Sequence, residues 1–130
     1  MATIKTTVLG DLAGNLVIND AADTNAVTNI TGATGSAYLI QIDATAGTPT
    51  TAEPACYVKI IDASGGVTGG GGSSSTPDLV LYAPLGQITT YVISGGWAFS
   101  AGLSLWAVQT AAVAGDVSPT ADVKVTIISS

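Results

Sequence analysis

Histidine and arginine do not occur in the 130 residues of the chain, and cysteine occurs once, at Cys56. These absences limit the chemistry, because a nucleophilic Ser or Cys needs a neighbouring base and a zinc site is built mostly from His and Cys. The nine acidic residues fall at the ends of predicted strands or in loops, where solvation is the ordinary reason for them. No two of them stand out as a general acid and base. We therefore expect a non-enzymatic protein with no catalytic residue, cofactor, metal or small-molecule substrate.

Charge is also scarce in this chain. Charged residues make up 9% of the sequence, and three lysines against nine acids give a formal net charge of -6, whereas about one quarter of an ordinary soluble domain is charged. Three scattered lysines cannot neutralise a row of phosphates or bind the chain to an anionic membrane surface. We expect neither nucleic acid nor a membrane as a partner. A neutral surface costs little to desolvate, which suits a protein that binds other proteins.

Residues 79–115 contain no charged residue but include both tryptophans and the only phenylalanine. The stretch alternates with a period of two, so that Ile88, Thr90 and Val92 are predicted to share one face of a strand. Its glycines and hydroxyl residues, and this period, argue against a membrane-spanning helix. We expect residues 79–115 to supply the largest pieces of the core, among them Trp106.

Further β-strands are predicted from short apolar runs bounded by Gly, Pro, Asn or Asp. The clearest of these runs are residues 3–9, 37–43, 56–62 and 122–128. The fold class that follows is all-β: a single-domain antiparallel β-sandwich or jelly-roll-like barrel of about eight to ten short strands.

Three side chains in these strands carry specific expectations. Strict alternation places Tyr38 on the same face as Ile40. Lys59 is predicted to lie at a strand edge, where it blunts unwanted pairing or extends its ammonium group to solvent. Cys56 is predicted to be a small buried hydrophobic residue.

Residues 1–130 are predicted to form one domain, with two segments set apart. Residues 1–30 either pack on this domain or form an extended N-terminal arm. Residues 63–78 read ASGGVTGGGGSSSTPD and are predicted to form a flexible Gly/Ser loop. No Lys and hydroxyl pair opening a helix follows the glycines, so a phosphate-binding loop is not indicated.

The order of motifs from about Gly32 to Ile128 resembles small structural proteins of tailed bacteriophages that infect marine bacteria and cyanobacteria. The resemblance is carried by the strand YVKIID, the hairpin around APLG and the corner GWAFSAGL before an apolar strand. It implies a β-rich head decoration or cement protein on the capsid exterior of the virion. Such a protein bridges subunits of the major capsid protein, often as a homotrimer, and the resemblance supplies no catalytic residue.

Two other functions stay open at this stage. The chain could be a tail, baseplate or fibre component, or a receptor-binding module that contacts host glycans through Trp97 or Trp106. It could also be a secreted adhesion module, although no secretory signal is visible in the sequence. The candidate interaction residues, from the Gly/Ser loop and the tryptophan corner, are Gly69, Gly70, Ser73, Ser74 and Trp97.

Overall fold

The computed structural model describes residues 4–8, 15–28, 30, 34–69, 75–115 and 117–130, with the first of these segments described by its backbone alone. Regular structure in these ranges is entirely β. The strands are β1 (Ile4–Val8), β2 (Asn15–Asn19), β3 (Gly35–Asp43), β4 (Ala55–Asp62), β5 (Leu79–Pro84), β6 (Ile88–Phe99), β7 (Leu103–Val108) and β8 (Lys124–Ser129). None of the described residues belongs to a helix able to cross a membrane.

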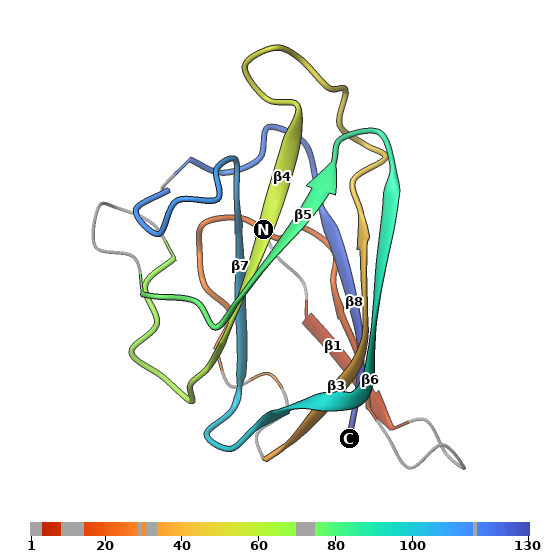
Figure 1. Cartoon of the computed structure of the whole chain (residues 1–130), viewed down its shortest axis with the longest axis vertical. Helices are drawn as coiled ribbons and strands as arrows, with labels where there is room; N and C mark the ends of the chain where they lie inside the picture. Colours follow the sequence, from red (N-terminus) through yellow and green to blue (C-terminus); the bar gives the residue numbers. More distant parts are fainter. Residues whose placement is uncertain (1–3, 9–14, 29, 31–33, 70–74, 116) are drawn as a thin grey trace.

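The strands form two antiparallel sheets that face each other (Figure 1). The order is β1-β2-β8-β3-β6 in the five-stranded sheet and β5-β4-β7 in the three-stranded sheet. This arrangement confirms the all-β class and the sandwich. Side chains are described for seven strands, fewer than the eight to ten expected. With β1, which is described by its backbone alone, the number of strands is eight.

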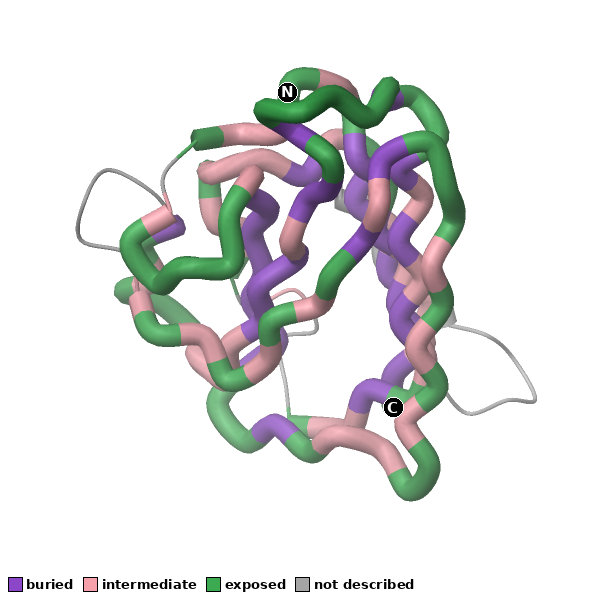
Figure 2. Tube along the Cα trace, turned by 45° about the horizontal axis from the view of Figure 1, so that its top comes forward, coloured by how far each residue is buried: buried purple, intermediate pink, exposed green. Residues whose placement is uncertain are grey.

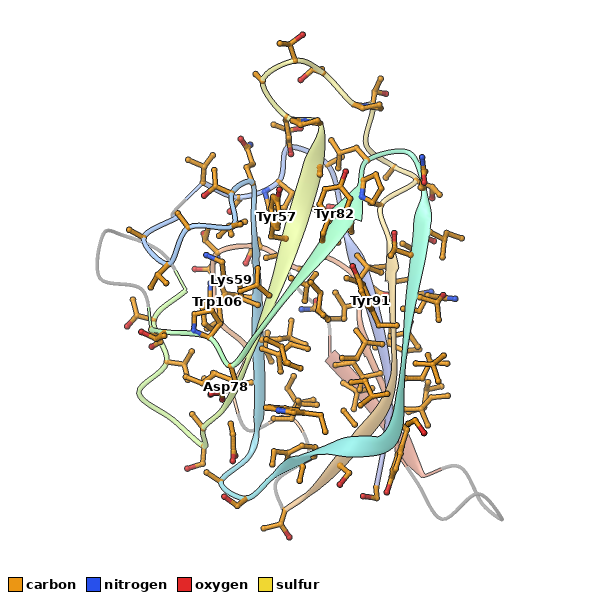
Figure 3. All side chains as sticks on the ribbon, in the orientation of Figure 1. Tyr57, Lys59, Asp78, Tyr82, Tyr91 and Trp106 are labelled. Atoms are coloured by element: carbon orange, nitrogen blue, oxygen red, sulfur yellow. The ribbon has the colours of Figure 1, made fainter. Side chains whose placement is uncertain are left out.

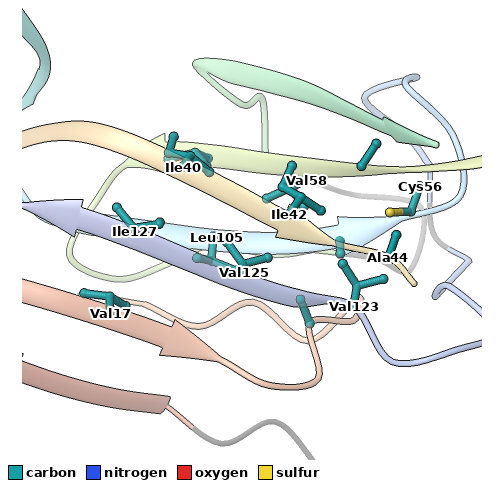
Figure 4. Close-up of a cluster of buried hydrophobic side chains, with 14 of the residues drawn as sticks. Val17, Ile40, Ile42, Ala44, Cys56, Val58, Leu105, Val123, Val125 and Ile127 are labelled. Carbon is teal, nitrogen blue, oxygen red and sulfur yellow. The ribbon is translucent and has the colours of Figure 1, made fainter. Parts of the chain in front are cut away.

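The hydrophobic core lies between the two sheets, because alternate residues of each strand point inward. The fully buried members include Ile40 and Ile42 of β3, Val125 and Ile127 of β8, Val58 of β4 and Leu105 of β7 (Figure 4). Ile60 of β4 and Leu103 of β7 belong to the same core. Each such side chain contributes about 1.5 to 3 kcal/mol by leaving water. Buried residues accordingly fill the middle of the molecule and exposed residues its rim (Figure 2).

Cys56 belongs to the same core, as the sequence predicted. Its side chain is fully buried, and this burial raises the pKa of its thiol to about 11. The thiol therefore stays protonated at neutral pH, and a protonated thiol is a poor nucleophile.

The expected alternation in β3 is wrong at Tyr38. A register shift between Ala37 and Leu39 makes Tyr38 one extra residue of β3 relative to β8, and on the other side Tyr38 lies opposite a longer bulge of β6, residues 93–96. Such a bulge turns the extra residue out of the regular pleat. Tyr38 is therefore 43% exposed, while Ile40 keeps its inward position.

The N-terminal part of the described chain packs on its own domain. Strand β2 pairs with β8 over five residue pairs. The chain then runs along the outer edge of β7, where Val27 and Leu105 exchange two backbone hydrogen bonds of 2.9 Å. The backbone N–H of Ala107 also donates to the Asp23 carbonyl at 2.8 Å. This covered edge helps to explain why all six residues of β7 are buried.

Candidate interaction surfaces

The outer face of the five-stranded sheet carries an apolar row that crosses four strands. Val92 of β6 lies opposite Leu39 of β3, Leu39 lies opposite Ile128 of β8, and Ile128 lies opposite Leu16 of β2. Val92 is 75% exposed and the other three are partly exposed. The residues on a solvent-exposed sheet face are normally polar, so this row of apolar residues is unusual. We call it the outer apolar row.

Uncharged polar residues form the next row of the same face. Gln41 lies between Thr90 and Thr126, and its side-chain amide donates to the Thr90 hydroxyl at 3.3 Å. Most of this face therefore offers methyl, hydroxyl and amide groups, which are inexpensive to desolvate compared with charges.

Charge enters this face at one end of the sheet. Asp43 lies opposite Lys124 across the β3 and β8 pair. Hydrogen bonds from Thr45, first from its hydroxyl at 2.5 Å and then from its backbone N–H at 3.0 Å, hold the pKa of Asp43 below its ordinary value. The attraction of Lys124 adds a smaller effect in the same direction. The two opposite charges leave this end of the face close to neutral.

Tyr38 borders the outer apolar row beside Leu39, on the side away from Asp43. A Cβ atom added at Gly96 would lie 2.8 Å from the Tyr38 ring, so the ring lies directly against the backbone of β6. Gly96 also has a φ of 80°, which L side chains rarely adopt. Glycine at this position thus lets β6 bend while Tyr38 covers the bend.

A smaller group of tyrosines lies on the edge of the three-stranded sheet. Tyr82 of β5 is 49% exposed, and its ring centroid lies 5.7 Å from that of Tyr57 on β4 (Figure 3). The Tyr91 hydroxyl of β6 donates to the Tyr82 carbonyl at 2.6 Å. This bond ties the neighbouring edges of the two sheets together.

Of the candidate interaction residues, the structure describes Gly69 and Trp97, and neither of them is exposed. Gly69 is buried, and a Cβ added there would lie 3.0 Å from the Trp106 ring and against the Thr24 carbonyl. Trp97 is partly buried on β6, where it packs on the core with its ring 6.1 Å from that of Phe99. Gly70, Ser73 and Ser74 lie outside the described residues. Gly69 therefore acts as a close backbone contact in this structure.

Lys59 contradicts the expectation of a strand edge. Strand β4 is the centre of the three-stranded sheet, and the Lys59 side chain is fully buried beside Trp106 (Figure 3). Its ammonium group donates to the Ala112 carbonyl, and within the described segments it forms no ion pair. Burial lowers the pKa of Lys59 because it disfavours the charged form.

Asp62 has a structural role. The sequence had indicated only that an acidic residue at this strand end would be solvated. Its carboxylate accepts hydrogen bonds from the backbone N–H groups of Ser100, Ala101 and Gly102 at 2.9, 2.8 and 3.1 Å. These donors hold the pKa of Asp62 below its ordinary value. The carboxylate thereby fixes the turn between β6 and β7 to the end of β4.

Glu53 has a comparable role between two loops. It is 6% exposed, and its carboxylate accepts from the Thr120 backbone N–H at 3.1 Å and from the Thr120 hydroxyl at 2.6 Å. Among the residues that the structure describes, no group of three or more His, Cys, Asp or Glu could hold a metal ion. The acids with described bonds thus bind the chain to itself.

Sequence reasoning did not identify the exposed apolar residues as candidates. The alternation of Ile88 and Val92 assigned them to one face of a strand, but nothing in that pattern says which face meets solvent. The structure shows that this face is the outer one, with Ile88 55% exposed. A weak signal was present, because β6 carries apolar residues on both faces and one sandwich core can cover only one of them.

Comparisons with protein-family models, with curated proteins and with solved structures find no match to this chain.

Proposed function

We propose that this chain is a non-enzymatic virion structural protein, a decoration or cement protein on the exterior of a bacteriophage capsid. In this role it bridges subunits of the major capsid protein and is present as a homo-oligomer, a trimer. The observation that carries the proposal is the outer apolar row, a nearly neutral sheet face with Val92 75% exposed. The resemblance of the sequence motifs supplies the kind of partner.

The low charge of the surface supports binding to a protein lattice. Lys124 and Asp43 are charged residues of the outer face, and they oppose each other. A docking partner therefore has to desolvate mainly methyl, hydroxyl and amide groups, which leaves more of the apolar burial as net affinity. Although the formal net charge of the chain is -6, the opposed Asp43 and Lys124 leave no strong field of either sign at this end of the face.

Many weak contacts suffice in such an assembly. A ligand that binds the expanded capsid and not its precursor stabilises the expanded state by mass action. Identical copies on a symmetric lattice repeat the same small contact, and linked copies gain further affinity because the second contact is intramolecular. A single face of modest size is enough for this function.

The alternative of a glycan-binding fibre module draws little support from the tryptophans. Trp106 is fully buried, so neither face of its indole is open for stacking on a sugar ring. Trp97 is partly buried and packs against the core. We therefore favour the decoration function.

A reconstitution experiment tests the proposal. Particles assembled without the chain are mixed with purified protein and sedimented, and bound protein is measured against added protein. Saturable binding to expanded particles, with much weaker binding to unexpanded ones, is the expected result. Absence of binding to either form would contradict the proposal.

Matched variants then test the surface. Ile128→Lys places a charge in the middle of the outer apolar row, and we expect it to weaken binding at least tenfold. Val113→Lys adds the same charge at a 45% exposed apolar residue of the loop that follows β7 and should bind like the wild type. Equal binding by both variants would show that another surface docks on the capsid.

A further inference from the structure

Strand β6 is an edge of the five-stranded sheet, and its outer side has no backbone partner. The strand pairs with β3 on one side only. Within the described ranges, no backbone group of residues 88–94 bonds to any other segment. A row of unpaired N–H and C=O groups is a template for another strand. Figure 1 shows β6 at the side of the sandwich, with no strand beyond it.

The two edges of the three-stranded sheet, β7 and β5, carry some form of protection. Backbone groups of Asp23, Val27 and Ile30 cover the edge of β7 by hydrogen bonds to its backbone. Strand β5 ends at Pro84, and its Tyr82 carbonyl accepts a hydrogen bond from the Tyr91 hydroxyl. Natural edge strands are commonly protected by charge, proline or cover. Residues 88–94 of β6 contain no charged residue and no proline.

The residues of this edge are arranged symmetrically about Thr90. Ile88 is 55% exposed and Val92 is 75% exposed, and each lies two residues from Thr90 on the same outer face. If a second copy pairs antiparallel with Thr90 at the two-fold axis, Ile88 of each chain lies opposite Val92 of the other. Directly opposed β-branched residues stabilise an antiparallel pair, and no like charges meet.

We propose that β6 is a two-fold contact between copies of this chain, in which residues 88–92 pair antiparallel with the same residues of a second copy. The contact joins two five-stranded sheets into one continuous sheet. It also places two outer apolar rows side by side, since Val92 belongs to both the row and the edge. The occupant is a second copy because the edge is complementary to itself.

This contact is independent of the proposed function. It requires only the isolated chain, and it would hold whether or not the protein is found on a capsid. A two-fold contact cannot itself close a three-fold ring, so on a lattice of trimers it would connect neighbouring trimers. Pairing of five residues makes a small interface, and we expect weak association that grows with concentration.

Cysteine cross-linking of the full chain tests the register. Opposed residues of antiparallel strands have Cα atoms about 4.5 to 5.5 Å apart, within the range of a disulfide. Thr90→Cys should therefore form a disulfide-linked dimer under mild oxidation. A mixture of Ile88→Cys and Val92→Cys proteins should give the mixed dimer. Ile88→Cys alone should not, because the two Ile88 positions would be about 14 Å apart.

The controls use residues outside the edge. Wild-type Cys56 is fully buried and should give no cross-link, and exposed Ser64→Cys should give only background. The specific pattern of Thr90 with itself and of residue 88 with residue 92 supports the proposal. Equal cross-linking at every exposed cysteine, or none at position 90, would overturn it.

Sedimentation of chains without added cysteines gives a second readout. Thr90→Lys brings two like charges together at the two-fold axis and should weaken association at least tenfold, with partial recovery at high salt. Ser64→Lys adds the same charge away from the edge and should associate like the wild type. A wild-type chain that does not self-associate at millimolar concentration would overturn the proposal.

Discussion

Lys59 on β4 and Trp106 on β7 lie directly opposite each other, and both side chains are fully buried although neither belongs to the core between the sheets. They form a second buried layer on the outer side of the three-stranded sheet. Gly69 covers the Trp106 ring, and the Ala112 carbonyl accepts from the Lys59 ammonium group. Gly69 and the loop after β7 therefore contribute to stability, because they cover this layer.

Removal of the Trp106 side chain tests this second layer. We expect Trp106→Ala to lower the free energy of unfolding by about 3 to 5 kcal/mol, because a large buried side chain is lost and a cavity remains. A domain of this size has about 5 to 15 kcal/mol in total, so the variant should be close to unfolding. Urea denaturation measures the change. A midpoint equal to that of the wild type would show that Trp106 is not packed as described.

Lys59 should make stability depend on pH in the alkaline range. Because burial lowers its pKa in the folded state below the ordinary value of 10.5, folding favours the uncharged amine. Stability should therefore rise as pH increases through the interval between the folded pKa and 10.5, and be lower below that interval. Lys59→Met should remove this dependence and be at least as stable as the wild type at pH 7.

The control for this prediction is Lys124→Met, which replaces an exposed lysine on β8. Unfolding of all three proteins is followed by fluorescence from pH 7 to pH 10. If Lys59→Met is less stable than the wild type at pH 7, and the difference persists at pH 10, then the lysine charge is compensated in the fold.

Asp62 should act in the opposite pH range. Its pKa is lowered in the folded state by the three backbone donors of the turn, so its contribution is present above the ordinary value of 3.8. This contribution is lost as pH falls through the folded pKa. Asp62→Asn should be less stable than the wild type at pH 7 and should lose less stability between pH 4 and pH 2.

Asp122→Asn, at an exposed residue before β8, is the matched control and should follow the wild type. Thermal melts across the acid range compare the three proteins. Identical acid profiles for Asp62→Asn and the wild type would exclude the turn as a source of acid sensitivity.

Two glycines of the same loop should respond differently to alanine. A Cβ atom at Gly69 would meet the Thr24 carbonyl and lie 3.0 Å from the Trp106 ring, whereas one at Gly65 would meet nothing within 4 Å. We expect Gly69→Ala to cost about 1 to 3 kcal/mol through overpacking. Gly65→Ala should stay within about 0.5 kcal/mol of the wild type. Equal stability of both variants, measured by urea denaturation, would contradict the close packing of Gly69.

Local pattern was sufficient to predict much of this fold. The apolar run at residues 122–128 predicted a strand, and β8 (Lys124–Ser129) lies there with Val125 and Ile127 at most 1% exposed. The strand at residues 56–62 begins one residue earlier than predicted and ends as predicted, at Asp62. These features depend on residues a few positions apart, which a single sequence displays directly.

The errors involve relationships between distant segments. The position of Lys59 depends on β4 having both β5 and β7 as neighbours, and strand order is not encoded in any one strand. The bulge at Tyr38 depends on the registers with β6 and β8. The same reason explains why the outer apolar row was not predicted, since its four residues come from four strands.

The most direct test of the proposed function is the copy number of this chain in gradient-purified particles, measured against the major capsid protein by quantitative mass spectrometry. A decoration protein should be present at about one copy per major capsid subunit, because it follows the symmetry of the lattice. A few copies per particle would place the chain at the tail or at a single vertex. Absence from purified particles would contradict the proposal.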